Sequence, residues 1–163
     1  MLIPYPLLQA AEIHITASDL AIEYAGFLAY FGVFGALGFR WLVLRRTAIR
    51  QPEIGAAGSP VALSLQSAEI GAARIGIIGA LFMLLNLLMN LSATATEKGV
   101  SFASAFSAGG VRAIVAFTFA LVFLVCFAVA LKRVRAAWTI AALAGIAFAL
   151  RSITSGKLAS LVN

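Results

Sequence analysis

The chain has 163 residues, of which 63% are hydrophobic and only 11% are charged. A water-soluble domain carries about a quarter of its residues as charges, because its surface must stay hydrated. This composition, with a mean hydropathy of +1.04, excludes a soluble enzyme and predicts an integral membrane protein. The net charge is +6, but the basic residues flank apolar segments, so they predict membrane orientation and no nucleic-acid partner.

The first apolar segment covers about residues 20–44 and is long enough to cross a bilayer as a helix. Residues 1–11 before it contain Pro4 and Pro6 and no basic residue. We therefore expect a short segment at the membrane interface there, and no cleaved signal peptide. After the first span, residues 54–66 contain two glycines and a proline and are predicted to form a loop.

Two further spans follow. The second covers about residues 72–91 and is expected to end at the polar run 92–98. The third, 111–131, is the clearest, because it is a nearly unbroken run of Ala, Val, Leu and Phe. Between them, residues 99–110 are rich in Ser, Ala, Gly and Phe but too short to cross a bilayer. We expect them to lie at the membrane interface.

A fourth span is predicted at about residues 136–153, although its apolar run ends at Arg151. A long arginine side chain near a helix end reaches the interface, which makes this position acceptable. The four segments predict an all-α integral membrane protein, a bundle of four transmembrane helices that forms a single domain over residues 1–163.

Two of the connections between spans are rich in basic residues, whereas the N-terminal segment has none. The positive-inside rule places these two connections in the cytoplasm and both termini on the outer side, in a multi-pass protein of the bacterial inner membrane. The basic residues are Arg45, Arg46 and Arg50 after the first span, and Lys132, Arg133 and Arg135 between the third and fourth.

Three charged residues lie near the outer ends of the predicted spans. Glu23 begins the first helix, Arg112 begins the third and Arg151 ends the fourth. We expect them to make interhelical contacts, with a gate or a site for an anionic headgroup as the alternative. On the inner side, Glu69 and Arg74 are poorly spaced for a pair within one helix, so we expect Arg74 to reach the interface or another helix.

A polar stripe runs along the second span, because Met83, Asn86 and Asn90 share one helix face. An asparagine amide in hydrocarbon needs a partner, so Asn86 and Asn90 are expected to make interhelical contacts in the bundle or with another subunit. The alternative is a ligand-facing stripe to which Met83 or Met89 offers a thioether.

Small residues recur at helical spacing on three of the spans. Such faces let helix backbones approach closely, which is how helices associate in a membrane. They therefore predict a tight bundle. The faces are Gly32, Gly35 and Gly38; Ala72, Gly76 and Ala80; and Ala141, Gly145 and Ala149.

Aromatic residues form two stripes, one on the first helix and one on the third. Core packing or lipid contact is their usual role; the alternative is a surface for a partner subunit or a bound lipid, pigment or quinone. Two tryptophans, Trp41 and Trp138, lie near the inner ends of their helices, as in an interfacial aromatic belt. The stripes are Phe27, Phe31 and Phe34, and Phe119, Phe123 and Phe127.

Residues that support catalysis are scarce in this sequence. His14 is the one histidine, and Cys126, the one cysteine, lies in an apolar run. No nucleophile–histidine–acid set, phosphate-binding loop or paired-cysteine motif is present, and the span centres contain no ionisable residue. We expect no catalysis, no intrinsic cofactor and no soluble substrate.

The first helix, which is aromatic and glycine-rich and ends in residues 41–46, resembles the opening helix of the copper resistance protein D (CopD)-like membrane family. The entry Gly109-Gly110-Val111-Arg112 to a long apolar helix closed by Lys132-Arg133 is similar to that family's glycine-then-basic helix start. The resemblance covers about residues 20–162. It implies a helical bundle in a bacterial inner membrane and a role in copper uptake or tolerance.

Copper(I) prefers soft ligands that converge in a cluster. The candidate ligands are scattered along this sequence, and His14 with Met89 is the pair expected on the outer side. Two classes of function remain. The favoured one is a non-catalytic accessory or structural subunit of a larger respiratory or photosynthetic membrane complex, with other membrane subunits and lipid as partners. The alternative is a CopD-like copper uptake or tolerance protein.

Overall fold

The computed structural model of the chain describes residues 17–46 and 60–161, and within them the backbone is almost entirely helical. Helix α1, Ala17–Gly38, continues as the π-helical segment η1, Phe39–Leu44. Three more helices follow: α3, Pro60–Glu97; α4, Phe102–Ala130; and α5, Arg135–Leu161. The predicted all-α class is confirmed for the part of the chain that the structure describes.

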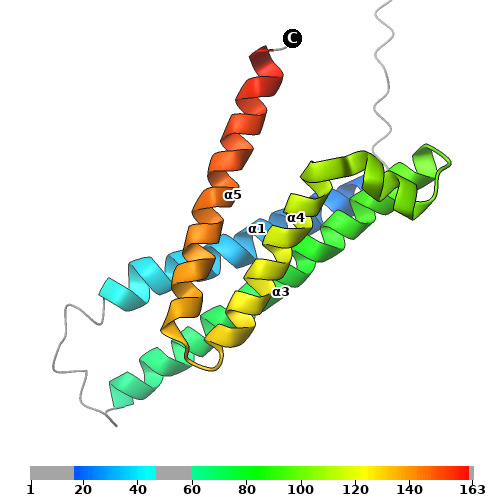
Figure 1. Cartoon of the computed structure of the whole chain (residues 1–163). Helices are drawn as coiled ribbons and strands as arrows, with labels where there is room; N and C mark the ends of the chain where they lie inside the picture. The colour runs from blue at the N-terminus through cyan, green and yellow to red at the C-terminus, as the bar shows by residue number, and fades with distance from the viewer. Residues whose placement is uncertain (1–16, 47–59, 162–163) are drawn as a thin grey trace, which may run out of the picture.

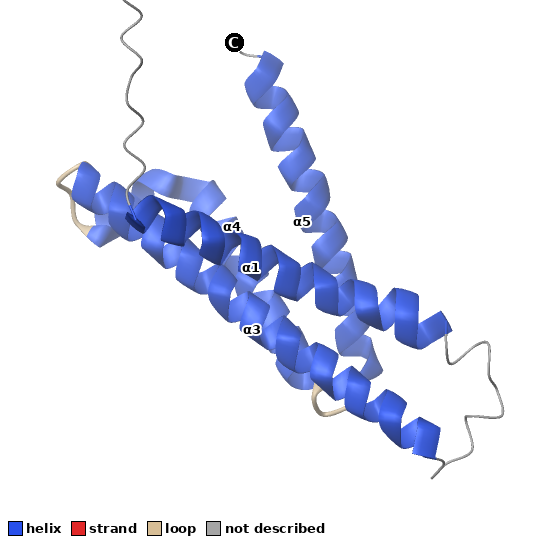
Figure 2. Cartoon of the chain, turned by 180° about the vertical axis from the view of Figure 1, so that it is seen from behind, coloured by secondary structure: helices blue, strands red, loops and turns tan. Residues whose placement is uncertain are grey.

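Helices α1, α3 and α4 form the body of the molecule, with α3 between its antiparallel neighbours α1 and α4 (Figure 1, and from behind in Figure 2). Within the described ranges, three helical stretches are long and apolar enough to cross a membrane. They are Leu20–Leu44, Pro60–Glu97 and Phe102–Ala130. The first of these has the bounds predicted from the sequence. The chain therefore has the helices of a membrane protein.

Helix α3 is much longer than the span predicted for it. Its 38 residues extend about 57 Å at 1.5 Å per residue, whereas the hydrocarbon core of a bilayer is about 30 Å thick. The predicted loop at 54–66 is wrong from Pro60 onward, because these residues form the first two turns of α3. Proline is well tolerated in the first turn, where its missing N–H would have no helical partner. Residues 54–59 lie outside the described part of the chain.

The second helix ends within the polar run 92–98, as predicted, but only at Glu97, beyond the predicted limit of the span near residue 91. The hydroxyl groups of Thr94 and Thr96 donate to carbonyl groups one turn earlier, at 2.9 and 3.0 Å, so the helix satisfies its own polar side chains. The helix ends where Gly99 takes a φ of +61°, which glycine adopts without steric cost. The N–H groups of Gly99 and Val100 then donate back to the last helical turn.

The segment 99–110, predicted to lie at the interface, is helical beyond Ser101. The Ser101 hydroxyl caps this helix by accepting a hydrogen bond from a backbone N–H of its first turn at 3.2 Å. At Gly110, with φ +51° and ψ −141°, the chain changes direction, so the short helix meets the long part of α4 at an angle (Figure 1). Phe106 on the short helix packs against Phe117 on the long part, with ring centroids 5.7 Å apart.

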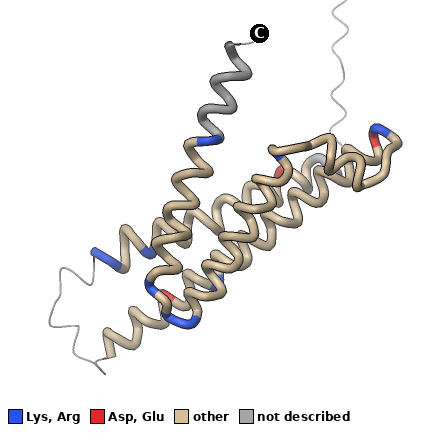
Figure 3. The backbone as a smooth tube through the Cα atoms, in the orientation of Figure 1, with Lys and Arg blue, Asp and Glu red and all other residues tan. Residues whose placement is uncertain are grey.

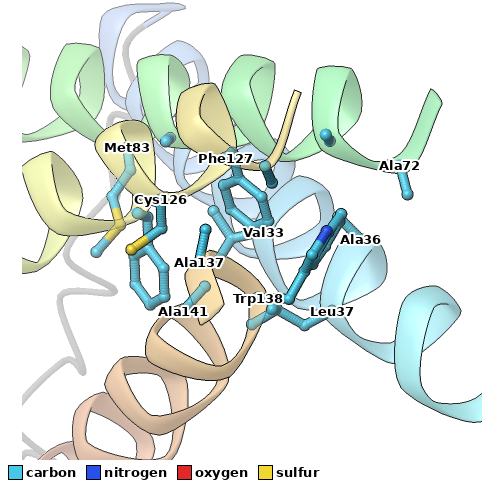
Figure 4. Close-up of a cluster of buried hydrophobic side chains, with 14 of the residues drawn as sticks. Val33, Ala36, Leu37, Ala72, Met83, Cys126, Phe127, Ala137, Trp138 and Ala141 are labelled. Atoms are coloured by element: carbon cyan, nitrogen blue, oxygen red, sulfur yellow. The ribbon is translucent and has the colours of Figure 1, made fainter. Parts of the chain in front are cut away.

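The helices approach most closely at glycines. A Cβ atom on Gly32 of α1 would lie 2.7 Å from the Cα of Gly79 on α3. A Cβ atom on Gly76 would lie 2.6 Å from ring carbons of Phe127 on α4. Gly32 and Gly76 belong to the predicted small-residue faces, whereas nothing lies within 4 Å of a Cβ atom on Gly35 or Gly38. The surrounding core, drawn in Figure 4, contains Val33, Leu37, Met83, Cys126, Trp138 and Ala141.

Helix α5 begins against the bundle and then leaves it. Trp138 and Ala141 are buried in the core, and Gly145 lies against Leu37 and Phe34 of α1. Further along, α5 runs away from the other helices, as Figures 1 and 2 both show. With 27 residues, α5 is longer than the predicted fourth span, and its crossing of the membrane stays a prediction.

Candidate functional site

Arg40 and Glu69 form an ion pair at one end of the bundle. The Arg40 Nε atom on η1 lies 2.8 Å from the Glu69 Oε1 atom on α3. The N–H of that nitrogen is not aligned for a hydrogen bond, so the attraction comes from the proximity of the charges. The Arg40 guanidinium also lies over the Trp138 ring, 5.9 Å from its centroid. Arg40 of η1 therefore contacts both α3 and α5.

Two tryptophans lie among these charges. Trp138 is only 2% exposed and packs edge-to-face on Phe127, with ring centroids 5.6 Å apart. Trp41 is half-buried, and the Arg45 guanidinium lies 4.9 Å from its ring centroid. Each indole N–H is buried and has no acceptor among the described residues. The pattern of tryptophan rings beside arginines is typical of the border between hydrocarbon and headgroups.

The helix that carries Arg40 is wound more loosely here. Residues Phe39–Leu44 form a π-helix, closed by a hydrogen bond from the Arg45 N–H to the Arg40 carbonyl group. Short π-helical turns occur inside α-helices most often at functional sites. The wider turn shifts the faces of η1 relative to α1. Leu44 is buried, while Arg40 and Trp41 are partly exposed.

The turn between α4 and α5 brings more cations to the same end. Lys132, Arg133 and Arg135 are all exposed. Arg133 has a φ of +65°, a left-handed conformation that is uncommon outside glycine. Its guanidinium faces the side-chain amide of Gln66 on α3; with the amide oxygen turned toward the guanidinium, that oxygen accepts from Nη2 at 2.7 Å and Nε at 3.0 Å. This contact fixes the turn against the first turns of α3.

The charges of the described residues are distributed unevenly (Figure 3). We call the exposed cations after η1 and around the turn between α4 and α5 the basic rim. Besides Glu69, the acidic residues Glu23 and Glu97 lie at the other end of the bundle, where α1 begins and α3 ends. The chemistry of the rim is that of an anion-attracting surface. Its members are Arg45, Arg46, Lys132, Arg133 and Arg135.

The predicted polar stripe lies in the other half of the bundle. Met83 is buried, Asn86 is half-buried and Asn90 is exposed, so the stripe turns gradually from the core to the surface. The Asn86 amide donates to the carbonyl group of Ile22 on α1 and so joins two helices. Asn90 bonds instead to Asn86 in its own helix, at 2.9 Å to the carbonyl oxygen.

Two of the charges predicted at the outer ends do not pair with each other. Glu23 and Arg112 are both exposed, and no ion pair joins them among the described residues. Arg151 is half-buried on α5. Met89, a weak candidate metal ligand, is half-buried on α3, and its proposed partner His14 lies outside the described residues.

The two aromatic stripes divide between surface and core. Phe27 and Phe31 are 65% and 69% exposed and stack on each other with centroids 6.3 Å apart. The prediction of a lipid-, pigment- or partner-facing stripe on α4 is wrong for Phe123 and Phe127, which are fully buried. They fill the space that Gly76 and the other small residues leave between the helices.

Phe34 and Phe119 of the same stripes lie between surface and core. Phe34 meets Phe123 edge-to-face at 6.4 Å, and Phe119 meets Phe148 of α5 edge-to-face at 5.4 Å. Tyr30 also lies beside Phe148, at 5.9 Å. These rings therefore connect α1, α4 and α5 at the level where α5 leaves the bundle.

The ion pair between Arg40 and Glu69 was not predicted from the sequence. A usable signal was present, because Gly32 and Gly79 mark the crossing of two antiparallel helices. Arg40 lies about two turns beyond Gly32, and Glu69 lies nearly three turns before Gly79, on the same side of the crossing.

In comparisons with known proteins, no family model matches the chain, and no curated protein or solved structure matches it.

Proposed function

We propose that this chain is a non-catalytic accessory subunit of a larger membrane complex, of respiratory or photosynthetic type, and that α5 packs against another subunit. The departure of α5 from its own bundle carries the proposal (Figure 2). Leu143 and Ile146 on this helix are 62% and 58% exposed. Helices in a membrane associate through close packing, and the backbone of α5 leads away from its own bundle.

In this proposal α5 is the fourth span of a four-helix membrane protein. Its 27 residues give about 40 Å, enough for the hydrocarbon core, and Arg151 reaches the interface. The basic rim faces the cytoplasm and both termini lie outside, in a bacterial inner membrane. The supporting observation is the collection of cations at one end of the bundle (Figure 3).

The exposed face of α1 is the second contact surface in this proposal. Phe27 and Phe31 stack on each other there, beside the exposed Tyr24. Such a surface suits acyl chains or the flat ring of a pigment or quinone held between this subunit and a neighbour.

Site-directed photo-crosslinking in native membranes tests the proposal. A photoreactive phenylalanine analogue replaces Leu143 or Ile146 on α5, and Leu121 or Val125 on the exposed face of α4 serves as the matched control. We expect the α5 positions to crosslink to one defined membrane protein, and the α4 positions to label lipid. Native mass spectrometry after mild-detergent purification should show the same protein in stoichiometric amount.

Two results would contradict the proposal. One is a chain that purifies as a lone monomer with no crosslink from α5. The other is crosslinking from α4 and α5 to many proteins at equal yield, which would indicate random collision in the membrane.

A copper uptake or tolerance protein is the alternative, and one observation favours it. Met83 and Cys126, two soft sulfur ligands, lie in the same buried cluster on facing helices (Figure 4). Copper-dependent growth of a deletion strain complemented with His14→Ala, Met89→Leu or Met83→Leu tests it. If these variants reproduce the copper phenotype of the deletion, the accessory-subunit proposal loses to this alternative.

A further inference from the structure

Two cations of the basic rim are held by uncharged groups, and no ion pair to the rim is found among the described residues. Arg133 is anchored by the Gln66 amide, and Arg45 lies over the Trp41 ring. Both anchors are uncharged. The carboxylate that the described residues bring to this end is Glu69, and its contact is with Arg40, which is not part of the rim. Within the described residues the rim therefore keeps its positive charge, and two of its side chains have fixed positions.

The depth of the rim follows from the helices that carry it. The turn from α4 to α5 is short, running from Leu131 to Val134 between two helices, so its cations cannot extend far from the end of the hydrocarbon. Trp41 and Trp138 lie at the same end of the bundle, where tryptophan marks the headgroup level. Cations at this level face the phosphate layer of the membrane.

We infer that the basic rim binds the headgroups of anionic phospholipids, with the Lys132, Arg133 and Arg135 turn as its centre. A guanidinium group presents a planar set of donors that matches phosphate oxygens, and two of the three side chains are arginines. The inference adds a lipid partner to the proposed function and rests on its membrane-inserted bundle.

Trp41 provides the measurement, because it is partly exposed and the rim residue Arg45 lies over its ring, while the buried Trp138 contributes a constant background. The full chain is reconstituted in vesicles of phosphatidylcholine and phosphatidylglycerol, one of which carries bromine atoms near the headgroup end of its acyl chains. Bromine quenches tryptophan fluorescence on contact. We expect brominated phosphatidylglycerol to bind at least about threefold better than brominated phosphatidylcholine at equal mole fraction, and the preference to fall as salt is raised.

A charge-neutralised variant locates the effect. Lys132→Gln, Arg133→Gln and Arg135→Gln together should bring the binding ratio of the two lipids to about one. The matched control, Lys98→Gln with Arg112→Gln, removes exposed cations of the opposite end and should keep the preference. The salt titration of the native chain tests the inference without any variant, in case the triple variant fails to fold.

The outcomes separate this inference from the proposed function. A chain that alkaline carbonate extracts from the vesicles has not inserted, which contradicts the membrane-inserted bundle itself. If the chain is inserted but both brominated lipids quench its tryptophan fluorescence equally, the lipid inference alone is overturned. It is also overturned by a control variant that loses the preference as fully as the triple variant, or by a preference abolished by inorganic phosphate at matched ionic strength.

Discussion

The side-chain amide of Asn86 on α3 donates a hydrogen bond to the backbone carbonyl group of Ile22 on α1. Gly26 leaves the room for it, because a Cβ atom there would lie 3.2 Å from the Asn86 Nδ2 atom. Asn90 then donates to the Asn86 side-chain oxygen at 3.1 Å. Hydrocarbon offers no other partner for these amides, so the contact fixes the register of α1 along α3.

Replacing Asn86 with leucine should destabilise the bundle by about 1 kcal/mol, the scale of an interhelical hydrogen bond in a membrane. The measurement is the free energy of unfolding in mixed detergent micelles. Asn90→Leu is the matched control, because it makes the same change in polarity but removes only bonds within α3. Equal losses for the two variants would show that the bond to Ile22 does not stabilise the pairing of α1 with α3.

Gly79→Ala should lower the free energy of unfolding by about 2 kcal/mol. The new methyl group would lie 2.6 Å from the Val33 backbone nitrogen and force α1 and α3 apart. Gly35→Ala on α1 is the control, since nothing lies within 4 Å of a Cβ atom there and alanine favours a helix. Unfolding in detergent measures both. A Gly79 variant as stable as the Gly35 variant would contradict the close backbone contact.

Gly110→Ala should destabilise the chain by about 1–2 kcal/mol, because a φ of +51° with a ψ of −141° is accessible only to glycine without strain. The same substitution at Gly71, a helical glycine with open space around it, should be neutral or stabilising. Thermal unfolding in detergent distinguishes them. A neutral Gly110→Ala would mean that the bend between the two parts of α4 tolerates an ordinary helical backbone.

The spans were predictable because hydrocarbon demands about 20 apolar residues in a row, and the first span has the predicted bounds. The extent of α3 was not. One end of α3 beyond the span begins with Pro60, and the other end is polar, so both are predicted as loops from the sequence. A first-turn proline and threonine hydroxyls nevertheless fit a helix well. The direction of the chain at Gly110 depends on one backbone conformation that composition does not reveal.

The aromatic stripe on α4 shows a second limit. In a soluble protein, polar neighbours mark the outer face of a helix, but in a membrane both faces are apolar. Spacing alone therefore could not separate the buried Phe123 and Phe127 from the exposed Phe27 and Phe31 of α1. The Asn86 contact was easier to anticipate, because an amide in hydrocarbon has few alternatives.

The Arg40–Glu69 pair should show a coupling free energy of about 0.5–1 kcal/mol in a double-mutant cycle, since both side chains are partly exposed and partly screened. The variants are Arg40→Met, Glu69→Gln and their combination, followed by unfolding in detergent. The control cycle combines Glu69→Gln with Arg74→Met on the same helix and should be additive. A coupling as large in the control cycle would assign the effect to net charge and not to the pair.

Arg133→Gly should be more stable than Arg133→Ala by about 1 kcal/mol, although glycine usually loosens a chain more than alanine does. Both variants lose the contact with Gln66, but only glycine relieves the left-handed backbone at φ +65°. Lys132 provides the control, because its φ is not positive, and there the glycine variant should be the less stable one. Unfolding of the four variants in detergent gives the two differences. If they have the same sign, Arg133 carries no backbone strain.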